Sequence, residues 1–130
     1  MSKKVLVVDD DPDVRTFIVT VLEENNFIPL VAKDGVEGLQ KIQNEKPDLV
    51  TLDVLMPRGS GIRLYRTLKT DDSFKNIPVI MLTGIALKSF LRSQKTLAEF
   101  KGEKVPEPDL YLEKPVEPEE LVEAIKKALN

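Results

Sequence analysis

The chain has 130 residues, of which 42% are hydrophobic and 32% charged, as in a single folded domain. It contains neither cysteine nor histidine, which excludes disulfides, thiol nucleophiles, histidine-ligated metals and a Ser-His triad. The net charge of −3 argues against nucleic-acid binding, and no apolar run approaches the ~20 residues of a membrane helix. We expect a soluble, cytoplasmic protein, because acids follow the short run Val5–Val8 at once, unlike in a signal peptide.

Short apolar runs alternate with stretches of helical periodicity. In chain order, the predicted strands are Val5–Val8, Ile28–Ala32, Leu49–Leu52, Val79–Leu82 and Leu110–Leu112. Five apolar stripes predict a helix after each strand. They lie on Val14, Phe17, Ile18, Val21 and Leu22; on Val36, Leu39 and Ile42; on Ile62, Tyr65 and Leu68; less regularly on Leu87, Phe90, Leu91 and Leu97; and on Leu121, Ala124, Ile125, Ala128 and Leu129. This (βα)5 pattern predicts an α/β fold in which helices cover both faces of a parallel sheet.

The prolines refine this prediction. Asp11 before Pro12 is typical of a helix N-cap followed by proline at the first helical position. Pro29 lies inside a predicted strand and therefore places that strand at a sheet edge. This agrees with the doubly wound, flavodoxin-like strand order 2-1-3-4-5, where the second strand is an edge. We expect one domain over residues 1–130, with a long loop at 101–109.

Chemistry-bearing residues follow four of the predicted strands. Ligands of doubly wound sheets bind beyond the carboxyl ends of the strands, where the strand order reverses, here between the first and third strands. Asp9 and Asp10 follow the first strand, Asp53 the third, Thr83 the fourth and Lys114 the fifth. Each alone could be a turn residue, a helix cap or a surface lysine. Together, at the strand ends of one inferred sheet, they predict a single functional pocket.

Clustered carboxylates need a cation, and Mg²⁺ (or Mn²⁺) is suited to oxygen ligands beside a phosphate. Lys114 adds a fixed positive charge and Thr83 adds a hydroxyl donor. A metal ion, an ammonium and a hydroxyl around a carboxylate are what phosphoryl transfer onto that carboxylate requires. Asp53 is the best candidate nucleophile. Asp9 and Asp10, a pair from one strand end, are better candidates for metal ligands.

The motifs at these strand ends are recognisable as a set. Their residues are 7–12 (VVDDDP), 48–57 (DLVTLDVLMP) with Gly61 behind it, 79–84 (VIMLTG) and 111–115 (YLEKP). Over essentially its whole length the chain resembles the receiver domain of two-component response regulators, particularly single-domain receivers of the chemotaxis type. The resemblance implies a signalling phosphoacceptor that promotes only its own phosphorylation and dephosphorylation, rather than a conventional enzyme.

The resemblance also implies roles for individual residues. Asp53 accepts the phosphoryl group from a phosphohistidine of a histidine kinase or phosphotransfer protein, and Lys114 pairs with that group. Asp10 binds Mg²⁺ directly and Asp9 at least through water, and further ligands are Asp53 and the backbone carbonyl of Leu55.

Thr83 and Tyr111 match the family's switch pair, whose movement remodels the face made by the fourth helix, fifth strand and fifth helix for protein–protein output. A cis peptide is expected at Lys114-Pro115, against a base rate of about 5–6% for X-Pro bonds.

The chain departs from the family in one place. Thirty residues separate Thr83 from Lys114, more than the family usually has, and they include five bases: Lys88, Arg92, Lys95, Lys101 and Lys104. A solvated helix face with a tolerated insertion is the simpler explanation, and a partner surface particular to this subgroup is the alternative. No effector or DNA-binding domain is expected within the chain. Its output is then a protein target or a weak homodimer, or it serves as a phosphoryl relay or sink.

Other classes fit the residues less well. A haloacid-dehalogenase-like phosphatase has Thr or Val where this chain has Asp13, and it needs a late acidic pair where this chain has Thr83-Gly84. A flavin-mononucleotide binder of the same fold would place three aspartates against its phosphate. An EF-hand fails because its sixth and twelfth loop positions hold Val14 and Thr20. A metal-independent pseudo-receiver would lack one of the acids, the threonine or the lysine.

Overall fold

The computed structural model describes residues 2–84 and 109–130, with the side chain of Thr83 outside the described part. Five parallel strands form one sheet in the order β2-β1-β3-β4-β5. The strands are β1 (Lys4–Val8), β2 (Ile28–Ala32), β3 (Leu49–Leu52), β4 (Val79–Thr83) and β5 (Leu110–Glu113). The predicted strands and their order are confirmed, including the edge position of β2 with Pro29.

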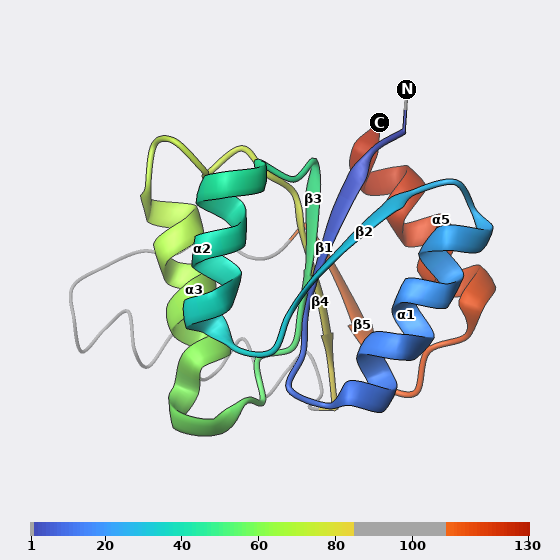
Figure 1. Cartoon of the computed structure of the whole chain (residues 1–130), viewed down its shortest axis with the longest axis horizontal. Coiled ribbons are helices and arrows are strands. Elements are labelled where there is room, and N and C mark those ends of the chain that lie inside the picture. The colour runs from blue at the N-terminus through green and yellow to red at the C-terminus, as the bar shows by residue number, and fades with distance from the viewer. Residues whose placement is uncertain (1, 85–108) are drawn as a thin grey trace.

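Four described helices cover the sheet (Figure 1). They are α1 (Pro12–Glu24), α2 (Gly35–Glu45), α3 (Ser60–Thr70) and α5 (Pro118–Leu129), with a short 3-10 turn at Pro57–Gly59 before α3. Helices α1 and α5 lie on one face of the sheet, and α2 and α3 lie on the other (Figure 1). The fourth predicted helix, the five bases from 88 to 104 and most of the predicted loop at 101–109 lie outside the described residues.

The strands divide their apolar side chains between the two faces. In β1, Val5 and Val7 join the core cluster of α1 and α5, while Leu6 and Val8 join the cluster of α2 and α3. All four side chains are buried. This pattern explains why the strands read as continuous apolar runs: a sheet covered on both faces has no polar face.

The helix starts follow from local sequence. Asp11 is the N-cap of α1, and its Oδ1 accepts a hydrogen bond from the Asp13 amide at 2.9 Å. Asp34 caps α2 in the same way, accepting from the Glu37 amide at 2.8 Å. Each cap satisfies a backbone amide that has no partner inside the helix. The caps therefore fix where α1 and α2 begin, next to the strand ends.

The carboxyl ends of the strands meet at one edge of the sheet. The Asp9 amide donates to the Ala32 carbonyl at 3.1 Å, and the Asp53 amide donates to the Val8 carbonyl at 3.0 Å. These bonds extend the ladders one residue past β1 and β3, so the backbones of Asp9 and Asp53 are held by the sheet itself. The expected cis peptide at Lys114-Pro115 is present. Within the described part of the chain, no helix has the length and apolarity needed to cross a bilayer.

Candidate functional site

Three carboxylates converge at this edge of the sheet. Asp9 is 2% exposed and Asp53 is 5% exposed, whereas Asp10 reaches solvent. One oxygen from each of Asp9, Asp10 and Asp53 lies within 4.8 Å of the others. The sheet places them together because their strands, β1 and β3, are neighbours that end at the same level. The structure therefore brings together the three acids that the sequence analysis assigned to one pocket.

Lys114 faces this cluster from the end of β5. Its Nζ lies 2.7 Å from Asp9 Oδ2 and 3.2 Å from Asp53 Oδ2. The ammonium thus compensates two buried carboxylates, whose mutual repulsion would otherwise destabilise the folded chain. The predicted surface-lysine alternative for Lys114 is excluded by these contacts.

Backbone amides hold the two buried carboxylates in place. Asp9 Oδ1 accepts from the Asp11 amide at 2.9 Å, and Asp53 Oδ1 accepts from the Leu55 amide at 2.9 Å. Each carboxylate therefore has one oxygen bound to the following loop and the other to Lys114. Two different partners therefore hold the Asp53 side chain in one orientation, the Leu55 amide at Oδ1 and Lys114 at Oδ2.

Arg15 is a site residue that the sequence analysis did not identify. Its Nη1 donates to the backbone carbonyl of Asp9 at 2.7 Å. The guanidinium thereby ties the first turns of α1 to the loop that carries the acids. The only signal in the sequence is that Arg15 is the sole base in α1, and no pattern indicates that its partner is a main-chain carbonyl.

The electrostatics follow from burial and pairing. Burial raises the pKa of Asp9, and the hydrogen bonds from Lys114 and the Asp11 amide oppose that rise only in part. Burial by itself would lower the pKa of Lys114, but the hydrogen bond to Asp9 and the charge of Asp53 outweigh it, so the pKa is raised. The ammonium form is therefore stabilised, and the site keeps a fixed positive charge facing Asp53.

Gly61 allows the loop after β3 to pack closely on α3. A Cβ atom at this position would overlap the Asp53 carbonyl oxygen and lie 2.8 Å from the Val54 Cα. Both neighbours are backbone atoms that cannot move aside independently of the site. In the sequence Gly61 was noted only as part of a motif. The structure explains why the residue is glycine, since any side chain would clash with the backbone of Asp53 and Val54.

The two predicted switch residues are described only in part. Thr83 ends β4, level with Glu113 of β5, and its side chain lies outside the described part. Tyr111, paired with Met81, is half-buried and packs against the core cluster on the α2–α3 face. Burial, together with the charges of Glu113 and Asp53, raises the pKa of Tyr111, so the phenol stays protonated.

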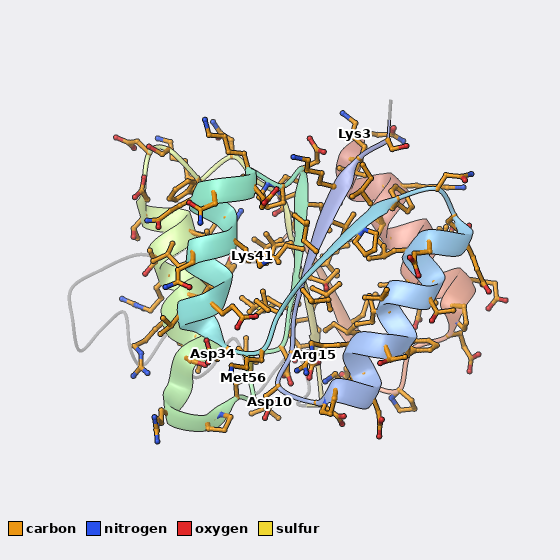
Figure 2. The ribbon with its side chains drawn as sticks, in the orientation of Figure 1. Lys3, Asp10, Arg15, Asp34, Lys41 and Met56 are labelled. Atoms are coloured by element: carbon orange, nitrogen blue, oxygen red, sulfur yellow. The ribbon has the colours of Figure 1, made fainter. Side chains whose placement is uncertain are left out.

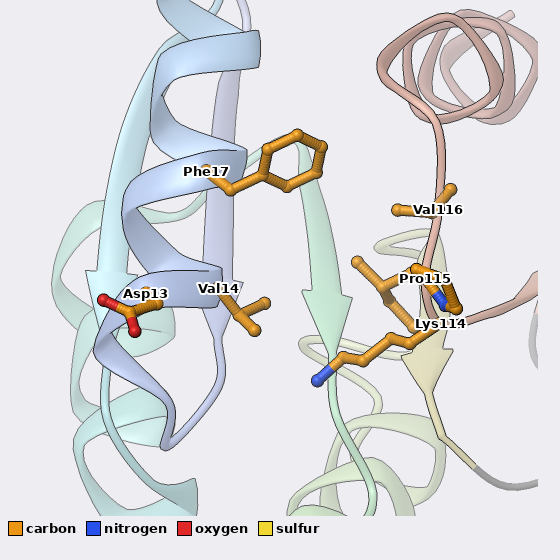
Figure 3. A pocket seen from close by; sticks show the side chains of 7 residues that line it. Asp13, Val14, Phe17, Lys114, Pro115 and Val116 are labelled. Carbon is orange, nitrogen blue, oxygen red and sulfur yellow. The ribbon is translucent and has the colours of Figure 1, made fainter.

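A groove opens beside Lys114 on the α1 side. Val14 and Phe17 of α1 face Pro115 and Val116 across it, and Lys114 lies at its end (Figure 3). The cavity measures about 480 Å³ and its walls are mostly apolar. Phe17 remains 38% exposed, a large value for an aromatic ring. The groove thus offers a contact surface next to the charged site.

The donor set fits a hard divalent cation. Asp9, Asp10 and Asp53 offer only oxygen atoms, and the exposure of Asp10 leaves room for the water ligands that Mg²⁺ keeps. Nitrogen and sulfur ligands for a softer metal are excluded by the absence of histidine and cysteine. The fit is therefore to Mg²⁺ or Mn²⁺, with one side of the cluster already occupied by Lys114.

A five-stranded doubly wound sheet with acids and one lysine at its carboxyl edge defines the receiver class of signalling domain. The family model described as the response regulator receiver domain matches residues 5–126. This chain belongs to that family.

Similar proteins and solved structures agree. The phosphate regulon transcriptional regulatory protein PhoB of Escherichia coli is 35% identical over all of this chain, which covers 53% of PhoB. Protein PilG of Pseudomonas aeruginosa is 33% identical over 95% of this chain and 84% of PilG. The chemotaxis protein CheY4 of Vibrio cholerae has a TM-score of 0.83 at 26% identity, with 99% of this chain and all of CheY4 covered. The chain spans about half the length of the PhoB relatives it matches.

Proposed function

We propose that this domain receives a phosphoryl group on Asp53 from the phosphohistidine of a histidine kinase or phosphotransfer protein. One observation carries the proposal. The buried Asp53 carboxylate lies 3.2 Å from the Lys114 ammonium, and one of its oxygens lies within 4.8 Å of an oxygen of Asp9 and of Asp10. A carboxylate that accepts a phosphoryl group needs positive charge for the three peripheral oxygens of that group.

In the proposed transfer, a carboxylate oxygen of Asp53 attacks the phosphorus while the bond from phosphorus to the histidine nitrogen breaks. Lys114 binds a peripheral oxygen of the phosphoryl group, and the Leu55 amide holds the other Asp53 oxygen. Asp9, Asp10, Asp53 and the Leu55 carbonyl would hold Mg²⁺, which supplies further positive charge when bound. The Thr83 hydroxyl is proposed as the third partner of the phosphoryl oxygens.

The apolar groove between α1 and residues 114–116 supports a protein donor. An amphipathic helix of a kinase or phosphotransfer protein, docked on Phe17 and Val116, would present its histidine beside Lys114. In this proposal the donor approaches from the α1 side of the site. The switch pair Thr83 and Tyr111 would then report phosphorylation to the face made by residues before β5, β5 itself and α5.

Residues 1–130 are proposed to act as one receiver unit whose output is contact with another protein. A phosphoryl relay or sink is the second candidate, supported by the donor groove, which serves a reversible transfer equally well. The family match leaves no support for the phosphatase of haloacid-dehalogenase type.

The test is labelling by a small acyl phosphate with Mg²⁺, followed by intact mass. The wild type should gain one phosphoryl group and Asp53→Asn none, because the amide is not a nucleophile. Asp72→Asn is the matched control, since Asp72 is an exposed aspartate that pairs with Lys75 at the surface. Equal labelling of the wild type and Asp53→Asn would show that the acceptor is elsewhere.

A further inference from the structure

A buried ammonium group outside the acidic cluster holds the start of β5. The side chain of Lys69, near the end of α3, is only 6% exposed. Its Nζ donates to Asp109 Oδ2 at 3.3 Å, to the Ile77 carbonyl at 3.0 Å and to the Lys75 carbonyl at 3.4 Å. These three acceptors match the three N–H bonds of an ammonium, so the buried charge is satisfied. One side chain thereby joins α3, the loop before β4 and the residue before β5.

Asp109 also binds β4. Its Oδ2 accepts a hydrogen bond from the Val79 amide at 2.8 Å, and the Asp109 amide donates to the Val79 carbonyl at 3.2 Å. Two hydrogen bonds therefore pair Asp109 with the first residue of β4. The strand ladder continues from this pair, with Leu110 opposite Ile80. We name Lys69 and Asp109, with the main-chain groups that they bind, the β5 anchor.

Side-chain packing fixes the position of β5 only weakly. The strand has four residues and lies at the edge of the described sheet, beside β4. Its apolar residues Leu110, Tyr111 and Leu112 are each partly buried, whereas residues 5–8 of β1 are fully buried. Burial of one set of side chains is what normally specifies the register of a strand. In β5 the register therefore depends more on the two hydrogen bonds between Asp109 and Val79, which form only when these residues lie opposite each other.

The register of β5 decides where the Lys114 ammonium lies. Lys114 directly follows the strand, and its Nζ lies 2.7 Å from Asp9 Oδ2 and 3.2 Å from Asp53 Oδ2. A slip by one residue would move β5 by about 3.3 Å along β4 and turn each side chain to the other face of the sheet. Hydrogen bonds do not tolerate such a displacement. The contacts of Lys114 with both carboxylates thus require the observed register.

We propose that Lys69 and Asp109 are positioning residues for phosphoryl transfer, because by fixing β5 on β4 they hold the Lys114 ammonium against Asp53. The anchor lies at the amino ends of β4 and β5, the edge of the sheet near Lys3 in Figure 2, and the acidic cluster lies at the opposite edge, near Asp10. The effect is therefore transmitted along β5 from one edge of the sheet to the other. This inference rests on the proposed function and assigns a role in it to two residues outside the acceptor site.

The first test removes each half of the anchor. Lys69→Met keeps the apolar stem without the ammonium, and Asp109→Ala removes the side-chain acceptor. Both should slow the labelling of Asp53 by acetyl phosphate at saturating Mg²⁺ about three- to tenfold, under conditions where the protein is fully folded. Asp109→Asn keeps an oxygen for the Val79 amide and should stay within about twofold of the wild type. Equal losses in Asp109→Asn and Asp109→Ala would overturn the proposal.

Val21→Ala is the control for lost stability. Val21 is a buried residue of α1 and belongs to neither the β5 anchor nor the acceptor site. The cavity should make this variant less stable than the wild type, yet the folded protein should be labelled at the wild-type rate. If Asp109→Ala is labelled as fast as Val21→Ala, the anchor contributes to stability alone and the proposal is wrong.

A double-mutant cycle shows whether the anchor acts through Lys114. In Lys114→Met protein the ammonium that β5 positions is absent. Adding Asp109→Ala to this variant should therefore change the labelling rate by less than about twofold. A loss as large as in the wild-type background would show that Asp109 acts by another route and would overturn the proposal.

Magnesium affinity separates positioning from a general distortion of the site. Retreat of the ammonium from Asp9 and Asp53 removes a positive charge that opposes binding of the ion. Asp109→Ala should therefore bind Mg²⁺ about two- to threefold more tightly than the wild type while it is labelled more slowly. Weaker Mg²⁺ binding together with slower labelling would mean that the whole site is distorted, contrary to the proposal.

Amide hydrogen exchange tests the anchor without any phosphoryl transfer. Amides of residues 110–113 should exchange about tenfold faster in Asp109→Ala than in the wild type, with smaller changes in β1 and β3. Unchanged exchange in β5 would contradict the proposal. If Asp53→Asn protein is labelled as well as the wild type, the proposed function itself fails. If only the anchor variants behave like the wild type, the anchor proposal fails and Asp53 remains the acceptor.

Discussion

One ammonium group joins side chains that are 61 and 105 positions away in the sequence. Lys114 binds Asp53 and Asp9, which come from β3 and β1, although β5 itself pairs only with β4. The three residues could be assigned to one pocket in advance because each follows an apolar strand, and parallel strands end at a common edge. That one ammonium binds both carboxylates depends on the length and direction of the side chains, which cannot be predicted from the pattern of strands.

Thr51 has a buried hydroxyl that finds no partner in the part of the chain that the structure describes. The residue is 1% exposed, in the middle of β3. An unsatisfied buried polar group costs about 1–3 kcal/mol, and an apolar group of similar shape removes that cost. Thr51→Val should therefore raise the free energy of unfolding in urea by about 1 kcal/mol.

Thr51→Ser is the matched comparison, because it keeps the hydroxyl and removes the methyl group. It should be less stable than the wild type by about 1 kcal/mol, through the cavity that it leaves. The stability order should thus be Val, Thr, Ser. A Val variant less stable than the wild type would mean that the hydroxyl is satisfied, for example by a buried water.

Gly61 and Gly84 give contrasting predictions. Gly61→Ala would force a Cβ against the Asp53 carbonyl and the Val54 Cα, so it should lower the free energy of unfolding by about 2 kcal/mol or more. It should also slow phosphorylation of Asp53 by a small acyl phosphate. At Gly84, the nearest atom that a Cβ would meet among the described residues, chain neighbours aside, is Leu55 Cδ1 at 3.9 Å, so Gly84→Ala should change stability by less than about 0.5 kcal/mol. Denaturant melts of both variants would check this, and equal effects would contradict the steric account.

At the scale of elements, the strands were predictable and several connections were not. Because helices bury both faces of the sheet, the strands appear in the sequence as uninterrupted apolar runs. The start of α1 is predictable because Asp11 is a typical N-cap and Pro12 a typical first helical residue. Arg58 and Lys46, however, adopt left-handed conformations that glycine or asparagine normally signals. Sequence patterns do not indicate such positions when an ordinary side chain occupies them, because surrounding structure imposes the conformation.

Helix α2 ends on one of these residues. Lys46 is its C-cap, with φ 49° and ψ 64°, and its amide donates to the Ile42 carbonyl. Glycine adopts this conformation without the clash that involves Cβ. Lys46→Gly should therefore raise the free energy of unfolding by about 0.5–1 kcal/mol, as measured by thermal or urea denaturation.

Lys41→Gly is the control for this prediction. Lys41 lies in the interior of α2, where glycine should lower stability by about 1 kcal/mol relative to a good helix former. The two substitutions remove the same side chain from the same helix and should have opposite signs. Two losses of similar size would show that the Lys46 side chain, rather than its backbone, stabilises the helix end.

At the scale of the whole molecule, ion binding and folding are coupled. A ligand that binds only the folded chain adds RT ln(1 + [L]/Kd), or about 1.4 kcal/mol at ten times Kd. Mg²⁺ should therefore raise the unfolding free energy of the wild type by about this amount. Asp10→Asn should lose most of the increment, because one of the three carboxylates is removed.

Asp13→Asn provides the matched control for the magnesium effect. Asp13 is an exposed acid in the first turn of α1 and does not belong to the carboxylate cluster. Its variant should keep the full increment with Mg²⁺. Urea unfolding curves in Mg²⁺-free buffer with a chelator set the baseline. An increment that is the same in Asp10→Asn and the wild type would place the ion elsewhere.

The edge strand β2 affects how two copies of this chain can associate. The Ile28 amide donates to the Lys3 carbonyl beside β1. Because backbone groups alternate in direction along a strand, those of Pro29 and Val31 point away from β1, toward the open edge of the sheet. Pro29 has no N–H, so one of the two outward-facing positions of this edge offers an incoming extended peptide no donor. The proline thereby disfavours the pairing of β2 from one copy with an edge strand of another copy.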